Sequence, residues 1–438
     1  MRFIQFWQKL LDKISKKDLI AVAFIFITLV FWAIRLWRFK ELMTFSSDQA
    51  LFLNEVWQMV DTRRISLVGS MVISKIVEGR GFFTGPLLYY LLTPLAFLTN
   101  WDVVGMTKLF MIVWWLTGVS LFFWIGRSKG WWIGLSAYLL YTVFPYLLTY
   151  NRLLWNPNFL PLLGVFFFWL LFLIRQESKL RLWLDLGLVV GLGINFHYGA
   201  LVWVLIVFWF WLYGLVKKKW GWVAILLLVL GIMIGDLPWF LFELRHNFYN
   251  LRTMIFFLSY SQKPEIDLRS FAFPLTPLVF WAWGALISLF VKKSKFLALF
   301  LFVLIFGIFL LMIDWSQTEG VGMPKNWNVL KQKEVAKMIC KDIGNYPFEV
   351  AATINGDTRA TDLRWWLGRE GCQPMGVEDY QSATILYLVA PESRPPEKET
   401  VWEIQSLRPF KIEKEVELGD KYIFYKLRRL PFVLEYNQ

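Results

Sequence analysis

Our interpretation of the chain depends most on one stretch, FSSDQALFLNEVWQMVDTRR, residues 45–64. Ser46 is followed three residues later by Gln49, a spacing typical of a capping box, so a helix is expected to begin there. The apolar residues of the stretch recur at helical spacing and its polar residues share another face: Leu53, Val56, Trp57 and Val60 against Asn54, Gln58 and Asp61. Such a helix is too polar to cross lipid, and we expect it to lie in the membrane interface.

Asp48 stands in the first turn of this helix and has two interpretations. An acidic side chain there complements the positive end of the helix dipole and needs no further role. A carboxylate beside a membrane is also suited to removing a proton from an acceptor hydroxyl. The choice between these two interpretations of Asp48 depends on the rest of the sequence.

The composition is that of an integral membrane protein. Of the 438 residues 57% are hydrophobic, and 26 Trp and 41 Phe are more than an ordinary soluble domain carries. Nine apolar runs approach the length of a bilayer-crossing helix: 18–37, 104–126, 131–149, 158–174, 182–196, 198–216, 222–242, 272–291 and 296–314. Residues 83–99 are also apolar but contain Gly85, Pro86 and Pro94, so we expect a second interfacial or re-entrant helix there.

The net charge of +13 predicts the orientation. Short loops rich in Lys and Arg are expected to be cytoplasmic, and they lie at 127–129, 175–181, 217–219 and 292–295. This predicts a multi-pass protein of the plasma (inner) membrane with a cytoplasmic amino terminus, a first external loop at 38–103 and an extracytoplasmic tail. The basic surplus favours the bilayer and phosphate groups as partners. Nucleic acid is excluded because the chain has no compact basic soluble module.

Residues 315–438 have the composition of a soluble domain. A helix is predicted at 328–343 and strands at 349–354, 383–389, 410–416 and 422–426, which together form a small α/β domain. Cys340 and Cys372 both lie in this tail and can pair if it faces an oxidising compartment. The predicted domains are therefore a membrane module, 1–314, and a soluble domain, 315–438.

Polar residues that orientation does not explain gather outside the membrane on this topology. They are Asp48, Glu55, Arg63, Arg64, Lys75, Arg80, Asn151, Arg152, Trp155, Asn156, Asn195, His197, Glu243, Arg245, His246 and Asn247. Such a set suits transfer of a sugar from a lipid phosphate, because cations hold the phosphate and a carboxylate deprotonates the acceptor. For each residue a plainer role stays open: headgroup binding for Arg, an interfacial belt for Trp and Tyr, packing for His.

The order of several motifs resembles the GT-C glycosyltransferases of family 39, which include protein mannosyltransferases and the lipid A aminoarabinose transferase. These motifs are FSSDQA, GPLLYYLL, GRSKG, NRLLWNPN and PWFLFELRHNF, over roughly residues 18–250. The resemblance implies an α-helical polytopic membrane protein of GT-C fold, with a conserved seven-helix module and two juxtamembrane helices in the first external loop. Together with the apolar runs, this predicts about nine transmembrane helices plus juxtamembrane helices. It also implies a polyprenyl-phosphate sugar donor and an inverting reaction.

By this resemblance Asp48 matches the first-loop catalytic acid, and His197 matches a metal-binding or donor-contacting position. Two departures stand out. Gln49 replaces the second acid that members often carry, and the Lys-Pro-Pro-Leu motif of some members is here Thr84-Gly85-Pro86-Leu87. The missing Lys contact would then have to come from Lys75, Arg80 or Arg152.

We therefore predict a membrane glycosyltransferase with Asp48 as the base. The predicted donor-phosphate contacts are Arg152, Arg245, His197, Lys75 and Arg80, and the predicted acceptor or sugar contacts are Glu55, Tyr89, Trp155, Asn156 and His246. The partners are a polyprenyl-phosphate-linked sugar and a glycan, lipid or protein acceptor. No cofactor is required by this chemistry, and a divalent cation is compatible with it. The alternatives are a transporter or flippase of a lipid-linked sugar, and a sensor whose tail binds a ligand.

Overall fold

The computed structural model describes residues 15–72, 81–259, 269–344 and 346–431. The chain divides into two compact units. The first consists of Met1–Trp37 and Gln58–Asp314, and the second of Arg38–Trp57 and Trp315–Gln438. Helix α4 (Ser47–Thr62) begins in the second unit and ends in the first.

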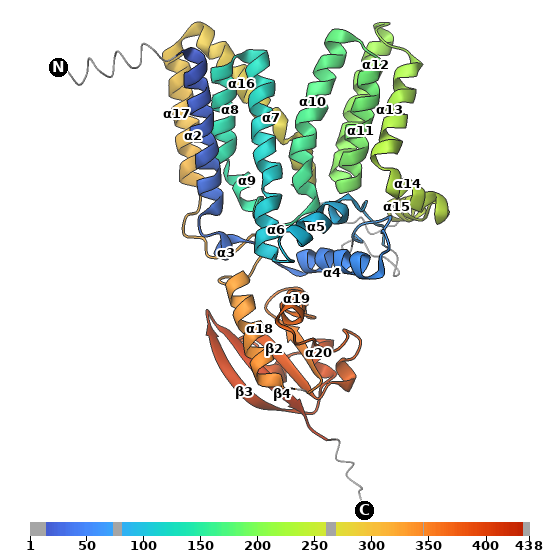
Figure 1. The fold of residues 1–438 in the computed structure, drawn as a ribbon, viewed down its shortest axis with the longest axis vertical. Coiled ribbons are helices and arrows are strands. Elements are labelled where there is room, and N and C mark those ends of the chain that lie inside the picture. The colour runs from blue at the N-terminus through green and yellow to red at the C-terminus, as the bar shows by residue number, and fades with distance from the viewer. Residues whose placement is uncertain (1–14, 73–80, 260–268, 345, 432–438) are drawn as a thin grey trace, which may run out of the picture. The chain divides into compact units, whose positions relative to one another are not determined.

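The first unit is helical (Figure 1). Its long helices run side by side, while α5, α6, α14 and α15 lie together at one end of them. The elements are α2 (Lys16–Leu36), α5 (Leu87–Leu98), α6 (Val103–Phe110), α7 (Ile112–Lys129), α8 (Trp131–Val143), α9 (Pro145–Tyr150), η2 (Asn156–Phe159), α10 (Leu160–Glu177), α11 (Arg181–Phe196), η3 (Tyr198–Ala200), α12 (Leu201–Val216), α13 (Trp222–Gly235), α14 (Leu237–Arg245), α15 (Tyr249–Ser259), α16 (Arg269–Lys293) and α17 (Lys295–Met312).

The polytopic membrane fold predicted from the sequence is confirmed. Among the described residues, six helices are long and apolar enough to cross a bilayer, or seven if α13 and α14 form one span. Each of the nine predicted runs is helical, but α8 and α11 have only 13 and 16 residues. Helix α5, from the ambiguous segment 83–99, has 12 residues and is shorter than a crossing helix requires.

Two of the predicted spans are interrupted at a proline. The run predicted at 131–149 breaks after Val143, because Pro145 starts the separate helix α9. The run predicted at 222–242 bends by 83° between α13 and α14. Pro238 stands in the first turn of α14, where a missing N–H does no harm, and so begins a new helix there.

Helices α11 and α13 approach each other so closely that only glycine fits at their contact. A Cβ on Gly187 or Gly191 would lie 2.1 or 2.4 Å from a carbonyl oxygen of α13. A Cβ on Gly231 or Gly235 would lie 2.3 or 2.5 Å from a carbonyl oxygen of α11. This four-residue spacing of small residues on both helices is the packing that membrane helices use when the hydrophobic effect does not drive them together.

The second unit contains a four-stranded sheet in the order β1-β2-β4-β3. Strands β1 and β2 are parallel, and the other two pairs are antiparallel. Its elements are α3 (Phe39–Leu42), α18 (Val329–Ile343), β1 (Phe348–Ala352), α19 (Thr361–Glu370), η4 (Tyr380–Ser382), β2 (Ile385–Pro391), η5 (Pro396–Lys398), α20 (Trp402–Gln405), β3 (Phe410–Gly419) and β4 (Tyr422–Arg429). Strand β2 is buried on both faces, from Ile385 to Ala390, so the unit has a core of its own.

The predicted helix and four strands of the tail are all present, and helix α19 was not predicted. Cys340 of α18 and Cys372, just after α19, form a disulfide. The second unit consists of Trp315–Gln438 together with Arg38–Trp57. Thr44 and Phe45 of that segment are hydrogen-bonded to Val321 and Gln332.

The close contact of α11 and α13 makes a prediction about stability. Gly231→Ala places a methyl group against the carbonyl of Leu184, so the helices must move apart. We expect a loss of about 1–3 kcal/mol, measured as earlier unfolding of the purified protein in detergent. Gly307→Ala in α17 is the matched control, because nothing lies within 4 Å of its added Cβ. Equal stability of the two variants would contradict the packing described here.

Candidate active site

The FTGPL segment, residues 83–87, is held by hydrogen bonds from three other parts of the first unit. The Phe83 N–H donates to Asn250 Oδ1 at 2.8 Å, and the Tyr198 hydroxyl donates to the Phe83 carbonyl. Asn195 supplies two acceptors: its carbonyl takes the Gly85 N–H at 2.9 Å and its Oδ1 takes the Leu87 N–H at 3.0 Å. The segment that the resemblance places near the donor is therefore fixed in position.

Two buried carboxylates support these contacts. Asp236, at the break between α13 and α14, accepts a 2.7 Å hydrogen bond at Oδ1 from the Asn195 amide. Glu243 accepts the N–H groups of Asn250 and Leu251 at 3.0 Å each, which satisfies the amino-terminal end of α15. Both acids are almost inaccessible to solvent. The bend in the α13–α14 pair thus carries the groups that hold residues 83–87.

Gly85 is required by the closeness of Asn195. A Cβ at this position would lie 2.1 Å from Asn195 Cγ, which is closer than any real contact. Only glycine fits at position 85, and this steric limit explains why the chain departs from the Lys-Pro-Pro-Leu pattern at that position.

The WNPN motif joins the same group. Asn156 in η2 donates from Nδ2 to the carbonyl of Phe196 at 2.8 Å, and Trp155 stacks on Tyr150 at 5.7 Å between ring centres. His197, half-buried, accepts the Gly199 N–H at Nδ1, which places the proton of a neutral ring on Nε2. The motif segments around residues 85, 156, 195–198 and 243–250 are consequently linked to one another.

Arg152 is buried and used mainly to cap a helix. Its Nη2 donates to the carbonyl of Ile34 at 2.8 Å and its Nε to that of Arg35 at 3.1 Å, at the carboxyl end of α2. Burial lowers the pKa of Arg152 to about 10, which leaves it charged at neutral pH. A cation there complements the negative end of the helix dipole.

Arg35 was not among the predicted site residues. It is fully buried, and its Nη1 donates to the carbonyl of Thr142, in the last turn of α8, at 3.0 Å. The guanidinium lies over the Phe31 ring, 3.6 Å from its centre. The sequence signal was an Arg near the end of an otherwise apolar run, and its partners are backbone carbonyls that a sequence does not reveal.

The other predicted residues of the first unit differ in accessibility. Arg245 and His246 are exposed at the end of α14, where the His246 ring stacks on Phe242 at 4.1 Å. Tyr89 is buried in α5. Lys75 and Arg80 lie outside the described residues.

Asp48 and Glu55 belong to the second unit. The α4 helix begins at Ser47 as predicted, with Gln49 Oε1 accepting the Ser46 N–H at 3.0 Å and the Ser46 hydroxyl at 2.8 Å. Solvent reaches the Asp48 side chain, but the surrounding protein partly desolvates the carboxylate and raises its pKa. The negative charge of Asp357 raises the pKa of Asp48 further.

The predicted apolar face of α4 is correct only in part. Leu53 and Val56 are completely buried, whereas Trp57 is 47% exposed. Gln49, Ala50 and Phe52, which the predicted face did not include, are buried instead.

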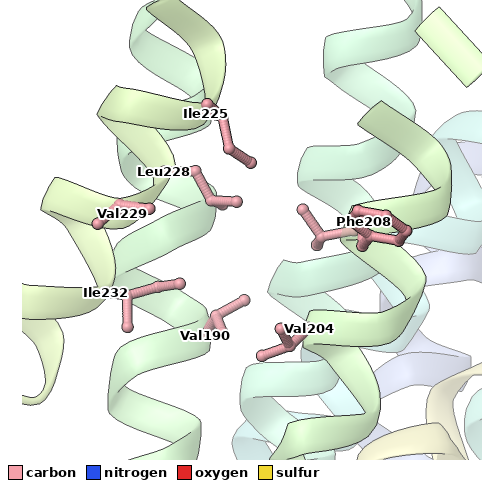
Figure 2. Close-up of a pocket in the computed structure, with 8 residues that line it drawn as sticks. Val190, Val204, Phe208, Ile225, Leu228, Val229 and Ile232 are labelled. Carbon is pink, nitrogen blue, oxygen red and sulfur yellow. The ribbon is translucent and has the colours of Figure 1, made fainter. Parts of the chain in front are cut away.

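Figure 2 shows an apolar pocket in the first unit, with Val190 of α11 and Leu228 and Ile232 of α13 facing Val204 and Phe208 of α12. No polar side chain lines it, so phosphate chemistry cannot take place there. Within the part of the chain that the structure describes, no group of three His, Cys, Asp or Glu side chains is arranged to hold a metal ion.

The crystal structures similar to this chain include two of ArnT. ArnT from Cupriavidus metallidurans bound to undecaprenyl phosphate matches with a TM-score of 0.59 at 9% identity, over 94% of this chain and 98% of that one. The apo state of the same protein matches with a TM-score of 0.55, at the same identity and coverage. The chain has the GT-C fold. No family model and no curated protein matches the sequence.

Within the first unit, hydrogen bonds join the segments around residues 85, 156, 195 and 243–250 into one framework, but the residues that build it were largely missed. Asn195 and Glu243 were predicted only as polar residues outside the membrane, and Asp236 and Asn250 were not among the predicted site residues. A usable signal was the pair of polar positions, 195 and 236, that interrupt neighbouring glycine-rich apolar runs. An intramembrane acid usually has a partner, and Asn195 is that partner.

The contact of Gly85 with Asn195 makes a prediction about local order. Gly85→Ala must displace the Asn195 side chain, and the hydrogen bonds to Leu87 and Asp236 are then lost. We expect faster amide hydrogen exchange in peptides covering residues 83–90, measured by mass spectrometry in detergent. Gly221→Ala, where nothing lies within 4 Å of the added Cβ, should leave the exchange of residues 83–90 unchanged. Wild-type exchange in Gly85→Ala would refute the role given to Asn195.

Proposed function

We propose that this protein is a membrane glycosyltransferase that moves a sugar from a polyprenyl-phosphate donor to an acceptor hydroxyl outside the cytoplasm. The observation that carries the proposal is the GT-C fold over 94% of the chain, in common with an ArnT structure bound to undecaprenyl phosphate. The linked motif segments support it, because residues 83–87, 156 and 195–198 are the positions that the family resemblance implicates.

In the proposed reaction Asp48 is the base. Its carboxylate removes the proton of the acceptor hydroxyl as the oxygen attacks C1 of the sugar. The bond from C1 to the phosphate oxygen breaks, and polyprenyl phosphate leaves with the electron pair. The raised pKa suits Asp48 to this task, since a base with a conjugate acid closer to neutrality takes the proton more readily.

The leaving phosphate needs cations to stabilise its charge. The predicted cations among the described residues differ in their exposure and in the hydrogen bonds they already make. Arg245 is exposed, and His197 carries its proton on Nε2 in the neutral form. Arg152 uses Nε and Nη2 on the carbonyls of α2, so we assign it mainly to holding α2 in place. Lys75 and Arg80 stay in the proposal as phosphate contacts, because an external basic loop is otherwise unexplained.

The predicted sugar and acceptor contacts also differ in their exposure and hydrogen bonding. Trp155 is half-buried, and Glu55 and His246 are exposed, so all three can meet a sugar. Tyr89 is buried, and the Asn156 amide donates to a backbone carbonyl; we therefore assign both to packing.

A transporter of a lipid-linked sugar is the second candidate, favoured by the broken pair α13–α14 with its buried Asp236. Transporters of that kind pair two broken helices around the substrate. The described residues contain one such bent pair. Asp236 is moreover hydrogen-bonded to Asn195, the residue that holds residues 83–87 in place. This structural contact accounts for the buried acid without a transport role.

The decisive test is Asp48→Asn. A general base contributes about 10²–10⁴-fold, so we expect kcat for sugar transfer from a polyprenyl-phosphate donor to fall by at least about 100-fold. The assay follows loss of the lipid-linked sugar in detergent. Asp61→Asn, an exposed acid farther along α4, is the control and should keep wild-type kcat. Unchanged turnover by a folded Asp48→Asn protein would remove Asp48 from the reaction.

The charge of Asp357 makes a prediction about pH. The base works ionised, so activity is lost as the pH falls through the pKa of Asp48. Asp357→Asn removes a charge that raises this pKa, and the acid limb of the kcat profile should move to lower pH. The variant retains an oxygen able to accept the Thr361 N–H, so this hydrogen bond at the amino end of α19 can persist. Asp420→Asn, an exposed acid of the same unit, should leave the limb in place. A shift to higher pH would contradict the assignment.

A further inference from the structure

The segment that precedes Asp48 is docked onto the carboxy-terminal helices of its own unit. Phe45 is completely buried, with its ring 5.0 Å from that of Trp366 in α19. Its carbonyl accepts a 2.9 Å hydrogen bond from Gln332 Nε2 of α18. One residue earlier, the Thr44 hydroxyl donates to the carbonyl of Val321 at 3.1 Å. Residues 44 and 45 are therefore held by a part of the chain that lies about 280 residues away in sequence.

Gln332 is the centre of this arrangement, and every hydrogen-bonding group of its amide is occupied. One Nε2 hydrogen goes to Phe45, and the other goes to Asp362 Oδ2 at 2.9 Å. Its Oε1 accepts the indole N–H of Trp366 at 3.0 Å. The side chain is completely buried. A buried amide with all its groups paired has one orientation, because each alternative leaves a donor or acceptor unpaired at a cost of about 1–3 kcal/mol.

The partners of Gln332 are themselves fixed. Asp362 is buried, accepts the Leu363 N–H at Oδ1 and receives the Trp327 indole N–H at 3.4 Å. Trp366 lies on the same α19 helix as Asp362, one turn later. The amide thus connects α18 and α19 to one carbonyl oxygen of residue 45.

Asp48 follows directly from that carbonyl. Ser46 donates hydrogen bonds from its N–H and its hydroxyl to Gln49 Oε1 of α4, and Asp48 stands in the first turn, three residues after Phe45. A helix start leaves little freedom between a fixed carbonyl and a first-turn side chain. Movement of Phe45 must therefore move the Asp48 carboxylate.

We propose that Gln332 is a positioning residue for Asp48, through which the carboxy-terminal part of the chain fixes the base for the reaction. The inference rests on the proposed glycosyltransferase function. It assigns residues 315–438 a part in catalysis itself, in addition to any part in selecting the acceptor. Gln332 acts through the Phe45 carbonyl and touches neither substrate.

The test is a double-mutant cycle of Gln332→Met with Asp48→Asn. Methionine has a similar size and removes all three hydrogen bonds of the amide. A displaced base loses rate and not donor binding, so we expect kcat to fall about 10- to 100-fold with an unchanged KM for the donor. In the Asp48→Asn background Gln332→Met should have no further effect on kcat, because the group that it positions is absent.

Controls separate positioning from folding. Lys337→Met, on an exposed position of α18, should keep wild-type kcat. Thr44→Val removes the neighbouring docking bond to Val321 and should lower kcat by a smaller factor, again only while Asp48 is present. Unfolding measurements in detergent identify any variant that has lost its fold. If Gln332→Met does not fold, Thr44→Val replaces it in the double-mutant cycle with Asp48→Asn.

The outcomes distinguish the two proposals. Wild-type kcat in Gln332→Met and Thr44→Val, with Asp48→Asn inactive, would overturn the positioning role and leave the proposed function in place. Equal losses from Gln332→Met with and without Asp48 would also overturn it, since the effect would then be structural. Wild-type turnover by Asp48→Asn would instead overturn the assigned base.

Discussion

The membrane unit depends on satisfying backbone groups where its helices break. Helices α11 and α13 are joined through contacts that only glycine allows, and both end at the same level, at Asn195 and Asp236. A chain that leaves a helix inside an apolar unit exposes N–H and carbonyl groups that water does not reach. Here the Asn195 amide binds Asp236 with its nitrogen and the Leu87 N–H with its oxygen. The carbonyl of Asn195 takes the Gly85 N–H as well, so one residue satisfies the break and fixes the neighbouring segment.

The charged residues of this unit follow the same constraint. Arg35 and Arg152 bond to the carboxyl ends of α8 and α2, and Glu243 bonds to the amino end of α15. In each case the sign of the charge matches the end of the helix dipole that it meets. Cations and acids in an apolar protein are commonly taken as marks of a ligand site. In this chain several of them are accounted for by backbone groups, which leaves Arg245 and His197 as the stronger described candidates for a phosphate.

Periodicity predicted the helices of this chain well, because it is a local property of the sequence. The capping pair at Ser46 and Gln49 marked the start of α4, and the tail was recognised as an α/β domain. Local rules failed where distant contacts decide. Trp57 has the spacing of the buried face but is exposed, and Arg152 has the composition of a ligand but caps α2. Gln332 carries no sequence signal at all, since an amide in the middle of a soluble helix is ordinary until its partners are known.

The choice of a neutral amide to hold the Asp48 segment has a physical consequence. A buried ion pair would have to overcome several kcal/mol of desolvation per charge, and its Coulomb attraction falls off slowly with distance, so small displacements would be tolerated. A glutamine bonded to Phe45, Asp362 and Trp366 works differently, because hydrogen bonds weaken steeply when their angles change. It also places no new charge beside Asp48, whose pKa already responds to Asp357. In the proposed reaction an uncharged, fully bonded side chain therefore defines where the carboxylate stands without altering how readily it takes a proton, and these are separate requirements for a base.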